Sequence, residues 1–216
     1  MASEPILNAL TVDLEEYFQV SNFERVVDRE SWGQLPSRVE SSTHQLLDAF
    51  DEFGHQSTFF VLGWVAERSP ALVREIAARG HEIACHGFGH QLVYEIGPER
   101  FREDLKRARG AIQEAVGVAV EGYRAPSYSI TRDSLWALDI LGEAGFRYDS
   151  SLFPIVHDRY GIPGAPRGPY RLRTASGREL IEIPPSTVRV GRWTIPAAGG
   201  GYLRLYPEWT TRWAIR

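Results

Sequence analysis

The chain lacks several features that would assign it to a special class of protein. It has a single cysteine, Cys85, which excludes an internal disulfide, and the surrounding "HEIACHG" favours strand packing over a nucleophile. No run of about 18 apolar residues occurs, so no transmembrane segment is expected. The first residues, "MASEPILNAL", lack the basic and apolar regions of a secretory leader. We therefore expect a cytoplasmic protein, unless a leader has been removed.

An excess of charge of either sign is also missing. The net charge is -4 and the pI is about 5.9, so there is no electrostatic reason to expect nucleic acid or an anionic membrane as a partner. A neutral substrate is expected instead. With 216 residues, 43% of them hydrophobic, the chain suits one large or two small globular domains. No pattern in the sequence predicts an oligomeric state.

What the chain does have is an alternation of amphipathic helices and short apolar strands over residues 1–150. The stretch "SRVESSTHQLLDAFDEFG" begins with a capping box, Ser37 and Glu40, ends at Gly54, and is followed by the strand "STFFVLG". The same order returns three times, in "SPALVREIAARG" with "HEIACHG", "PERFREDLKRARGAIQEAVG" with "VAVEGYRAP", and "TRDSLWALDILGEAG" with "FRYDSSL". We therefore predict an α/β fold, a distorted (β/α) barrel with about seven parallel strands.

The pattern changes in residues 152–216, which begin with a stretch rich in proline, glycine and arginine. Short β-like runs, "ELIEIPPSTV" and "WTIPAAGGGYLRL", follow. We interpret this region as a loop and edge strands that close the site, within one catalytic domain over residues 1–216.

Polar residues stand where the predicted strands end, which is where the chemistry of a βα barrel takes place. In chain order they are Asp13, Glu15, His86, His90, Arg124 and Asp149. Each has an ordinary explanation when taken alone, such as a surface acid, a chance pair of histidines or a structural arginine. Their occurrence at successive strand ends favours a shared site.

The residue types match a hydrolytic metal centre. Two histidines and one carboxylate are a known zinc ligand set, and the spacing of His86 and His90 places both on one side of a turn. Asp13 and Glu15 are two apart in a strand and point the same way. One acid can therefore bind metal while the other takes a proton from water, and Arg124 can hold that base ionised.

Six motifs give the chain a resemblance to a known family. They are "VDLEEYFQV", "CHGFGH", "YRAPSYS", "YDSSLFP", "HDRYGIP" and "EIPPST". In combination they resemble the polysaccharide deacetylase superfamily, also called the NodB-homology or carbohydrate esterase family four group. More narrowly, they resemble the exopolysaccharide-locus deacetylases found with the exosortase/PEP-CTERM system.

The resemblance implies a function and a role for each residue. The activity would be metal-dependent removal of N-acetyl groups from aminosugars of a poly- or oligosaccharide. Asp13 would be the base, Glu15, His86 and His90 would hold a divalent metal, most simply Zn²⁺, and Arg124 would orient the base. An allantoinase-like hydrolase of cyclic amides or imides, and a non-catalytic carbohydrate-binding module, remain as alternatives.

The chain departs from the family pattern at several positions. Leu14 separates Asp13 from the second acid, Glu15, where adjacent aspartates are commonest, and Gly87 replaces the usual serine or threonine after the first metal histidine. The residues after "YRAP" are shifted by one place. The oxyanion amide is therefore located only to the pair Ser127 and Tyr128, which with Asp149 are expected on the substrate side.

A late histidine that would protonate the leaving amine is missing between Asp158 and Arg216, which leaves His157 as the only late candidate. His157 lies in a proline-rich loop, where we expect it to shape the loop or contact substrate, with the acid role as the alternative. The run "YPEWTTRWAIR" begins like a helix and stops without a cap. We therefore also expect that a longer natural chain carries the missing histidine.

Overall fold

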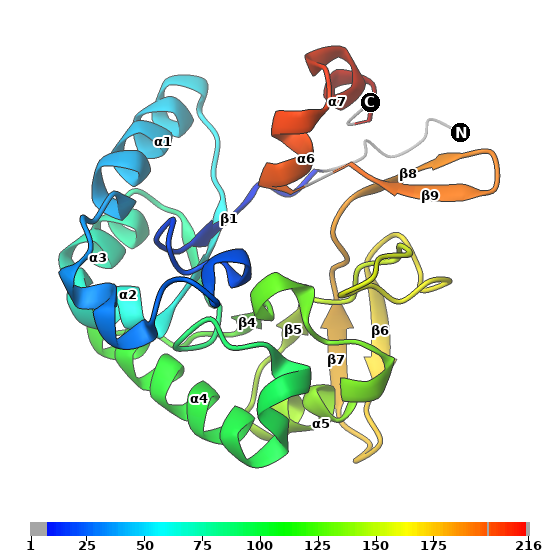
Figure 1. Ribbon diagram of the computed structural model, residues 1–216, viewed down its shortest axis with the longest axis horizontal. Helices are drawn as coiled ribbons and strands as arrows, with labels where there is room; N and C mark the ends of the chain where they lie inside the picture. The colour runs from blue at the N-terminus through cyan, green and yellow to red at the C-terminus, as the bar shows by residue number, and fades with distance from the viewer. Residues whose placement is uncertain (1–7, 198, 215–216) are drawn as a thin grey trace.

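A seven-stranded sheet forms the centre of the molecule in the computed structural model, which describes residues 8–197 and 199–214 (Figure 1). The strand order is β1-β2-β3-β4-β5-β7-β6. The bounds are β1 Thr11–Leu14, β2 Thr58–Val61, β3 Glu82–Cys85, β4 Gly122–Tyr123, β5 Tyr148–Asp149, β6 Tyr170–Arg173 and β7 Glu179–Glu182. All neighbours pair in parallel except β6 and β7, which are antiparallel. The predicted α/β class and distorted barrel are confirmed, with β6 as an antiparallel edge strand.

Helices cover the outside of the sheet, as the cyan and green ribbons in Figure 1 show. They are α1 Val39–Phe53, α2 Gly63–Arg68, α3 Pro70–Ala78, α4 Val93–Val116 and α5 Trp136–Glu143. Each buries its apolar stripe, as Leu47, Val73 and Ile112 do without any exposed surface. Helix α4 begins earlier than the sequence predicts. Its first turn is set off at Gly97, whose φ of 74° breaks the helix before Pro98.

The region after Ser151 joins the sheet through β7, which inserts between β5 and β6. Beyond it lie a separate hairpin, β8 Thr187–Val190 and β9 Trp193–Pro196, and the helices α6 Gly200–Leu205 and α7 Glu208–Ala214. Four short 3₁₀ helices lie in loops at Ser21–Phe23, Arg29–Gln34, Pro126–Tyr128 and Arg132–Ser134. Over the described ranges, no helix combines the length and apolar character needed to cross a bilayer.

The start of α1 differs from the capping box expected at Ser37 and Glu40. The helix begins at Val39, and a residue distant in sequence caps it. The Glu16 carboxylate accepts the backbone N–H groups of Arg38, at 3.0 Å, and Val39, at 3.4 Å. Glu16 is only 1% exposed. Its negative charge is tolerated there because the free amides and the dipole of a helix N-terminus stabilise it. It therefore connects the loop after β1 to α1.

We expect Glu16→Ala to lower the free energy of unfolding by about 1 to 3 kcal/mol, because it leaves buried amides of α1 without an acceptor. Urea denaturation followed by circular dichroism measures this change. Glu52→Ala, which removes an exposed carboxylate from the same helix, is the control and should change stability by less than about 0.5 kcal/mol. Equal effects of the two variants would contradict the capping role.

Candidate active site

A cavity of about 100 Å³ lies where β1, β3 and β4 end, as the barrel pattern predicts. Its lining includes most of the polar residues that the sequence places at strand ends. The lining residues are Asp13, Glu15, Val20, His86, His90, Ala125, Ser127 and Tyr128. Asp13 belongs to β1, whereas the histidines follow β3 and the last three residues follow β4.

Three potential metal ligands converge in this cavity. Glu15 Oε2 lies 2.9 Å from His90 Nε2 and 3.9 Å from His86 Nε2, and one ligand atom from each residue lies within 4.8 Å of the others. Both histidines are almost fully buried. Glu15 Oε2 is also buried and has no hydrogen-bond donor among the described residues. A divalent cation would neutralise this carboxylate, so the residues present fit a site of the zinc type.

The backbone fixes the state of His86. Its Nδ1 lies 2.8 Å from the carbonyl oxygen of Arg124, and because a carbonyl only accepts, Nδ1–H is the donor. Nε2 therefore presents its lone pair to the cavity. Burial lowers the pKa of His86 despite the nearby Asp13 and Glu15 carboxylates, which favours the neutral imidazole that metals bind.

Asp104, on α4, holds the loop that carries the two histidines. Its carboxylate accepts the backbone N–H groups of Phe88, at 2.9 Å, and Gly89, at 3.4 Å. Gly87 has a φ of 75°, and a Cβ there would lie 2.9 Å from Asp104 Oδ2, which accounts for glycine at this position. No sequence pattern predicts this role, because Asp104 stands among the charges of an ordinary solvated helix face.

The second acid, Asp13, lies outside the ligand cluster and pairs with Arg124. Arg124 Nη1 donates to Asp13 Oδ1 at 2.8 Å and to Thr11 Oγ1 at 3.0 Å. Burial raises the pKa of Asp13, but the charge of Arg124 and its hydrogen bond, with smaller contributions from the nearby His86 and His90 rings, outweigh it and lower the pKa. Asp13 is therefore ionised and oriented, as a general base must be.

Strained backbone lines the same cavity. Within the described part of the chain, the non-glycine residues with positive φ are His90 at 50°, Ser127 at 50° and Tyr128 at 53°. Such conformations cost free energy and cluster at functional sites. Ser127 Oγ lies 3.0 Å from Ser21 Oγ, and burial raises the pKa of Tyr128 to about 12, so its hydroxyl stays protonated.

Two predicted site residues lie away from the cavity. Asp149, expected on the substrate side, is 0% exposed and accepts a 2.6 Å hydrogen bond from Ser151 Oγ. His157 lies in the loop after β5, where its Nδ1 is 2.9 Å from Asp158 Oδ1 and its ring stacks on Tyr160 at 3.8 Å. Neither residue lines the cavity that holds Asp13.

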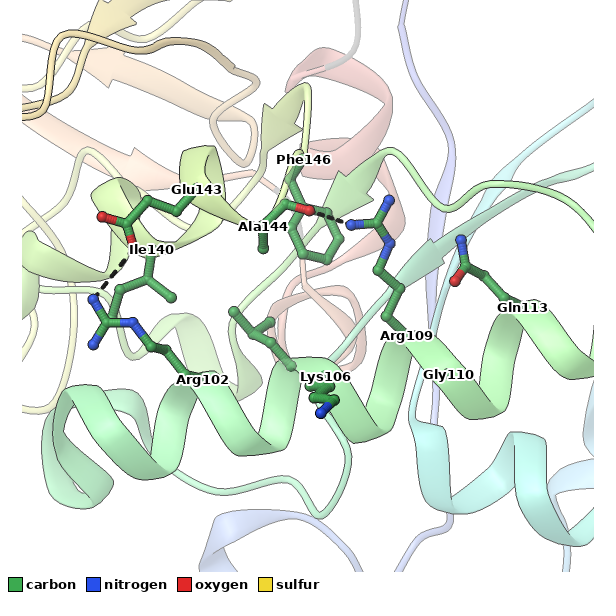
Figure 2. A pocket seen from close by; sticks show the side chains of 10 residues that line it. Arg102, Lys106, Arg109, Gly110, Gln113, Ile140, Glu143, Ala144 and Phe146 are labelled. Carbon is green, nitrogen blue, oxygen red and sulfur yellow. Dashed lines mark hydrogen bonds and ion pairs between the residues drawn. The ribbon is translucent and has the colours of Figure 1, made fainter.

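A larger groove, of about 610 Å³, lies between α4 and α5 (Figure 2). Three of its charged side chains, those of Arg102, Glu143 and Arg109, have partners. Arg102 Nη2 donates to Glu143 Oε2 at 3.2 Å, and Arg109 Nη1 donates to the Ala144 carbonyl oxygen. The described residues place no group of three metal-binding side chains there, since the one such group is Glu15, His86 and His90. The chemistry therefore concentrates at the smaller cavity.

The cluster of two imidazoles and a carboxylate on this fold is a candidate metal site with the ligand types of hydrolytic zinc centres. The chain belongs to the polysaccharide deacetylase family, whose family model matches residues 31–148. His86, His90 and Arg124 fall inside the match, whereas Asp13 and Glu15 precede it. A second family model, described as a domain of unknown function (DUF3473), matches residues 150–216.

Individual relatives agree with the family. The chain is 29% identical over 98 residues to a peptidoglycan-N-acetylglucosamine deacetylase of Bacillus cereus, covering 45% of this chain and 36% of the relative. It is 35% identical over 100 residues to a chitooligosaccharide deacetylase of Sinorhizobium fredii, covering 46% and 44% respectively. The chain thus spans less than half the length of these relatives.

Solved structures extend the likeness beyond the aligned sequences. A crystal structure described as "putative polysaccharide deacetylase from Mycobacterium smegmatis" is 28% identical with a TM-score of 0.64, covering 89% of this chain and 64% of that one. The fold also resembles a structure described as the Bc1960 peptidoglycan N-acetylglucosamine deacetylase, at 23% identity and a TM-score of 0.50, covering 65% of this chain and 54% of that one. The likeness to the first structure includes the region after residue 150, because the match covers most of the chain.

We expect Asp104→Ala to weaken the affinity for Zn²⁺ about 10- to 100-fold, because it frees the loop between the two histidines. Isothermal titration of the metal-stripped protein measures the affinity. Glu103→Ala, which removes an exposed carboxylate from the neighbouring position on α4, should bind Zn²⁺ as the unmodified chain does. Unchanged affinity in Asp104→Ala would contradict the loop-holding role.

Proposed function

We propose that the chain hydrolyses the N-acetyl group of an aminosugar in a poly- or oligosaccharide, in a metal-dependent reaction. One observation carries the proposal, namely that the ion pair of Asp13 and Arg124 opens on the same cavity as the cluster of Glu15, His86 and His90. The family, and the peptidoglycan and chitooligosaccharide deacetylases among its relatives, support the substrate class.

Glu15, His86 and His90 would hold the divalent cation, for which zinc fits the donor set best. Bound there, the cation supplies Lewis acidity that activates water and polarises the acetyl carbonyl. Asp13 removes the proton from the attacking water, and Arg124 keeps this carboxylate ionised and aimed. Of the two candidate amides for the developing charge on the carbonyl oxygen, that of Tyr128 donates to the Ala125 carbonyl oxygen at 3.0 Å, so we propose the Ser127 N–H for this role.

We propose His157 as the proton donor for the departing amine, which requires the glycan to extend beyond the cavity that holds Asp13, since His157 does not line that cavity. Its ring is linked to the cavity through Tyr160, which lies 3.8 Å from His157 and 5.8 Å from Tyr128 between ring centroids. In the structure His157 Nδ1 accepts the Arg159 backbone N–H at 3.1 Å, and Asp158 Oδ1 lies 2.9 Å from the same nitrogen, so protonation of the ring would exchange the first contact for the second. We further propose that residues 152–216 form one catalytic domain with the preceding sheet, since β7 lies between β5 and β6.

The motif resemblance supports a finer assignment, in which the substrate is an exopolysaccharide processed with an exosortase/PEP-CTERM system. A panel of N-acetylated glycans, including peptidoglycan fragments and chitooligosaccharides, separates these substrates by the rate of acetate release. Cyclic ureides added to the same panel test the allantoinase-like alternative.

We expect Asp13→Asn to reduce turnover by a factor on the order of 10² to 10⁴ with Zn²⁺ still bound, because the general base is lost while the three ligands remain. Acetate release, with metal content measured by mass spectrometry, separates the two effects. Asp133→Asn, at an exposed position, should retain full turnover. Normal turnover in Asp13→Asn would place the base elsewhere.

We expect His157→Ala to reduce acetate release about 100-fold without loss of metal, because the amine then departs without a proton donor. The measurement uses the same glycan and metal content as above. His55→Ala, at an exposed position, is the matched histidine control. Turnover equal to that of the control would contradict the acid role of His157.

A further inference from the structure

Two carboxyl groups lie together in the interior, outside the candidate cavity. Asp149 on β5 and Glu182 on β7 are paired in the parallel register, and both are 0% exposed. Residues paired across neighbouring strands have side chains on the same face of the sheet, and these two carboxyl groups are close enough for each to change the pKa of the other. Burying two adjacent carboxylates is unfavourable unless they share a proton or face cations.

The pair holds the segment that follows β5. Asp149 accepts Ser151 Oγ–H at 2.6 Å and the Ser151 N–H at 3.2 Å. Glu182 Oε1 accepts the Leu152 N–H at 3.0 Å, whereas Glu182 Oε2 is buried without a donor from the described residues. A proton on Glu182 Oε2, directed at Asp149, would satisfy this oxygen and remove the repulsion between the two groups.

Residues 150–152 also contact Arg124, which pairs with the proposed base, and the backbone just before the strained turn at Ser127. Arg124 donates from Nε to the Ser150 carbonyl oxygen at 3.3 Å and from Nη2 to Ser150 Oγ at 2.9 Å. Ser151 Oγ accepts the Ala125 N–H at 2.8 Å, two residues before the turn at Ser127. Ser150 therefore holds Nε and Nη2 of Arg124, and this leaves Nη1 directed at Asp13.

We propose that Asp149 and Glu182 are positioning residues that share one proton and hold residues 150–152, so that Ser150 aims Arg124 at Asp13. This inference rests on the proposed deacetylase function for its kinetic consequence. It assigns a role to Glu182 that the strand-end motifs did not suggest. The role lies in the interior, because neither carboxyl has an exposed surface through which to contact a glycan.

Burial is the main cause that raises the pKa of both groups, that of Asp149 to about 6, in agreement with one shared proton at neutral pH. The titratable or charged groups that face the pair from neighbouring strands are Tyr123 and Arg124, at the end of β4, and Tyr170 on β6. The pKa values of both tyrosines are raised, so they stay neutral. Arg124 is the one cation among these groups.

The kinetic test is a double-mutant cycle between Glu182→Leu and Arg124→Ala, scored by acetate release at saturating glycan with metal content measured in parallel. We expect Glu182→Leu alone to lower kcat about 10- to 100-fold with unchanged metal content and little change in KM. In the Arg124→Ala background, Glu182→Leu should lower kcat by less than about threefold, because the guanidinium that Glu182 positions is absent. Equal losses in both backgrounds would overturn the positioning role.

Glu182→Gln is the conservative variant, since its amide can still donate to Asp149 and accept from Leu152. It should restore most of the kcat that Glu182→Leu loses. Glu179→Gln, at the exposed start of β7, is the matched control. A Glu182→Gln variant as impaired as Glu182→Leu would contradict the shared proton.

A second measurement needs no turnover and so separates this inference from the proposed function. Because the stabilisation from a raised carboxyl pKa is lost as the pH rises through that pKa, the pair should lower the Tm of the unmodified chain between about pH 5 and 8, whereas the lowered pKa values of His81 and His86 act in the opposite direction in every variant. Glu182→Gln should show a shallower fall, since its pair has one titrating group fewer. Identical slopes would overturn the shared proton, whereas absence of acetate release from the unmodified chain would overturn only the deacetylase function.

Discussion

The buried guanidinium of Arg124 is the constraint on which the rest of the site depends. It is 5% exposed, and a cation with this little water contact is stable only when most of its donors have acceptors. Those acceptors come from two strands that are distant in sequence, Thr11 and Asp13 on β1 and Ser150 after β5. The guanidinium therefore ties the first and fifth strand ends together across the site.

The backbone of the same residue serves the metal-binding side of the cavity. The Arg124 carbonyl oxygen accepts the Nδ1–H of His86, while its side chain pairs with Asp13. One residue at the end of β4 thus sets the tautomer of a proposed ligand and the orientation of the proposed base. A displacement of β4 would disturb both at once, which couples the two halves of the site mechanically.

The sequence predicted the parts of the molecule that local patterns encode. Helices and strands alternate at fixed spacing, and polar residues at parallel strand ends must converge, so Asp13, His86, His90 and Arg124 were found. Contacts between segments that are distant in sequence carry no such pattern. Glu16 as a helix cap was therefore missed, as was Asp104 behind the histidine loop.

The lack of a local pattern for contacts between distant segments also explains why Asp149, at the end of β5, was expected at the substrate and why Glu182, at the end of β7, was not expected to have a role. Asp149 stands at a strand end like the cavity residues, so the pattern placed it with them. The register of β5 with β7 is set only when the region after residue 150 folds back, and it directs both side chains to the interior. The strand-end rule gives the edge of the sheet on which a residue lies, but not how deeply its side chain is buried.

Charge balance around Arg124 connects these buried acids to the chemistry. If Asp149 and Glu182 were both ionised, the two charges would attract the same guanidinium that holds Asp13, and they would compete with the proposed base for it. A proton between them leaves the pair with a single charge, and serine oxygens rather than carboxylates contact Nε and Nη2. Among the described residues, Asp13 is then the only carboxylate that accepts a hydrogen bond from Arg124. Arg124 therefore forms its ion pair with Asp13, the carboxylate that lines the cavity.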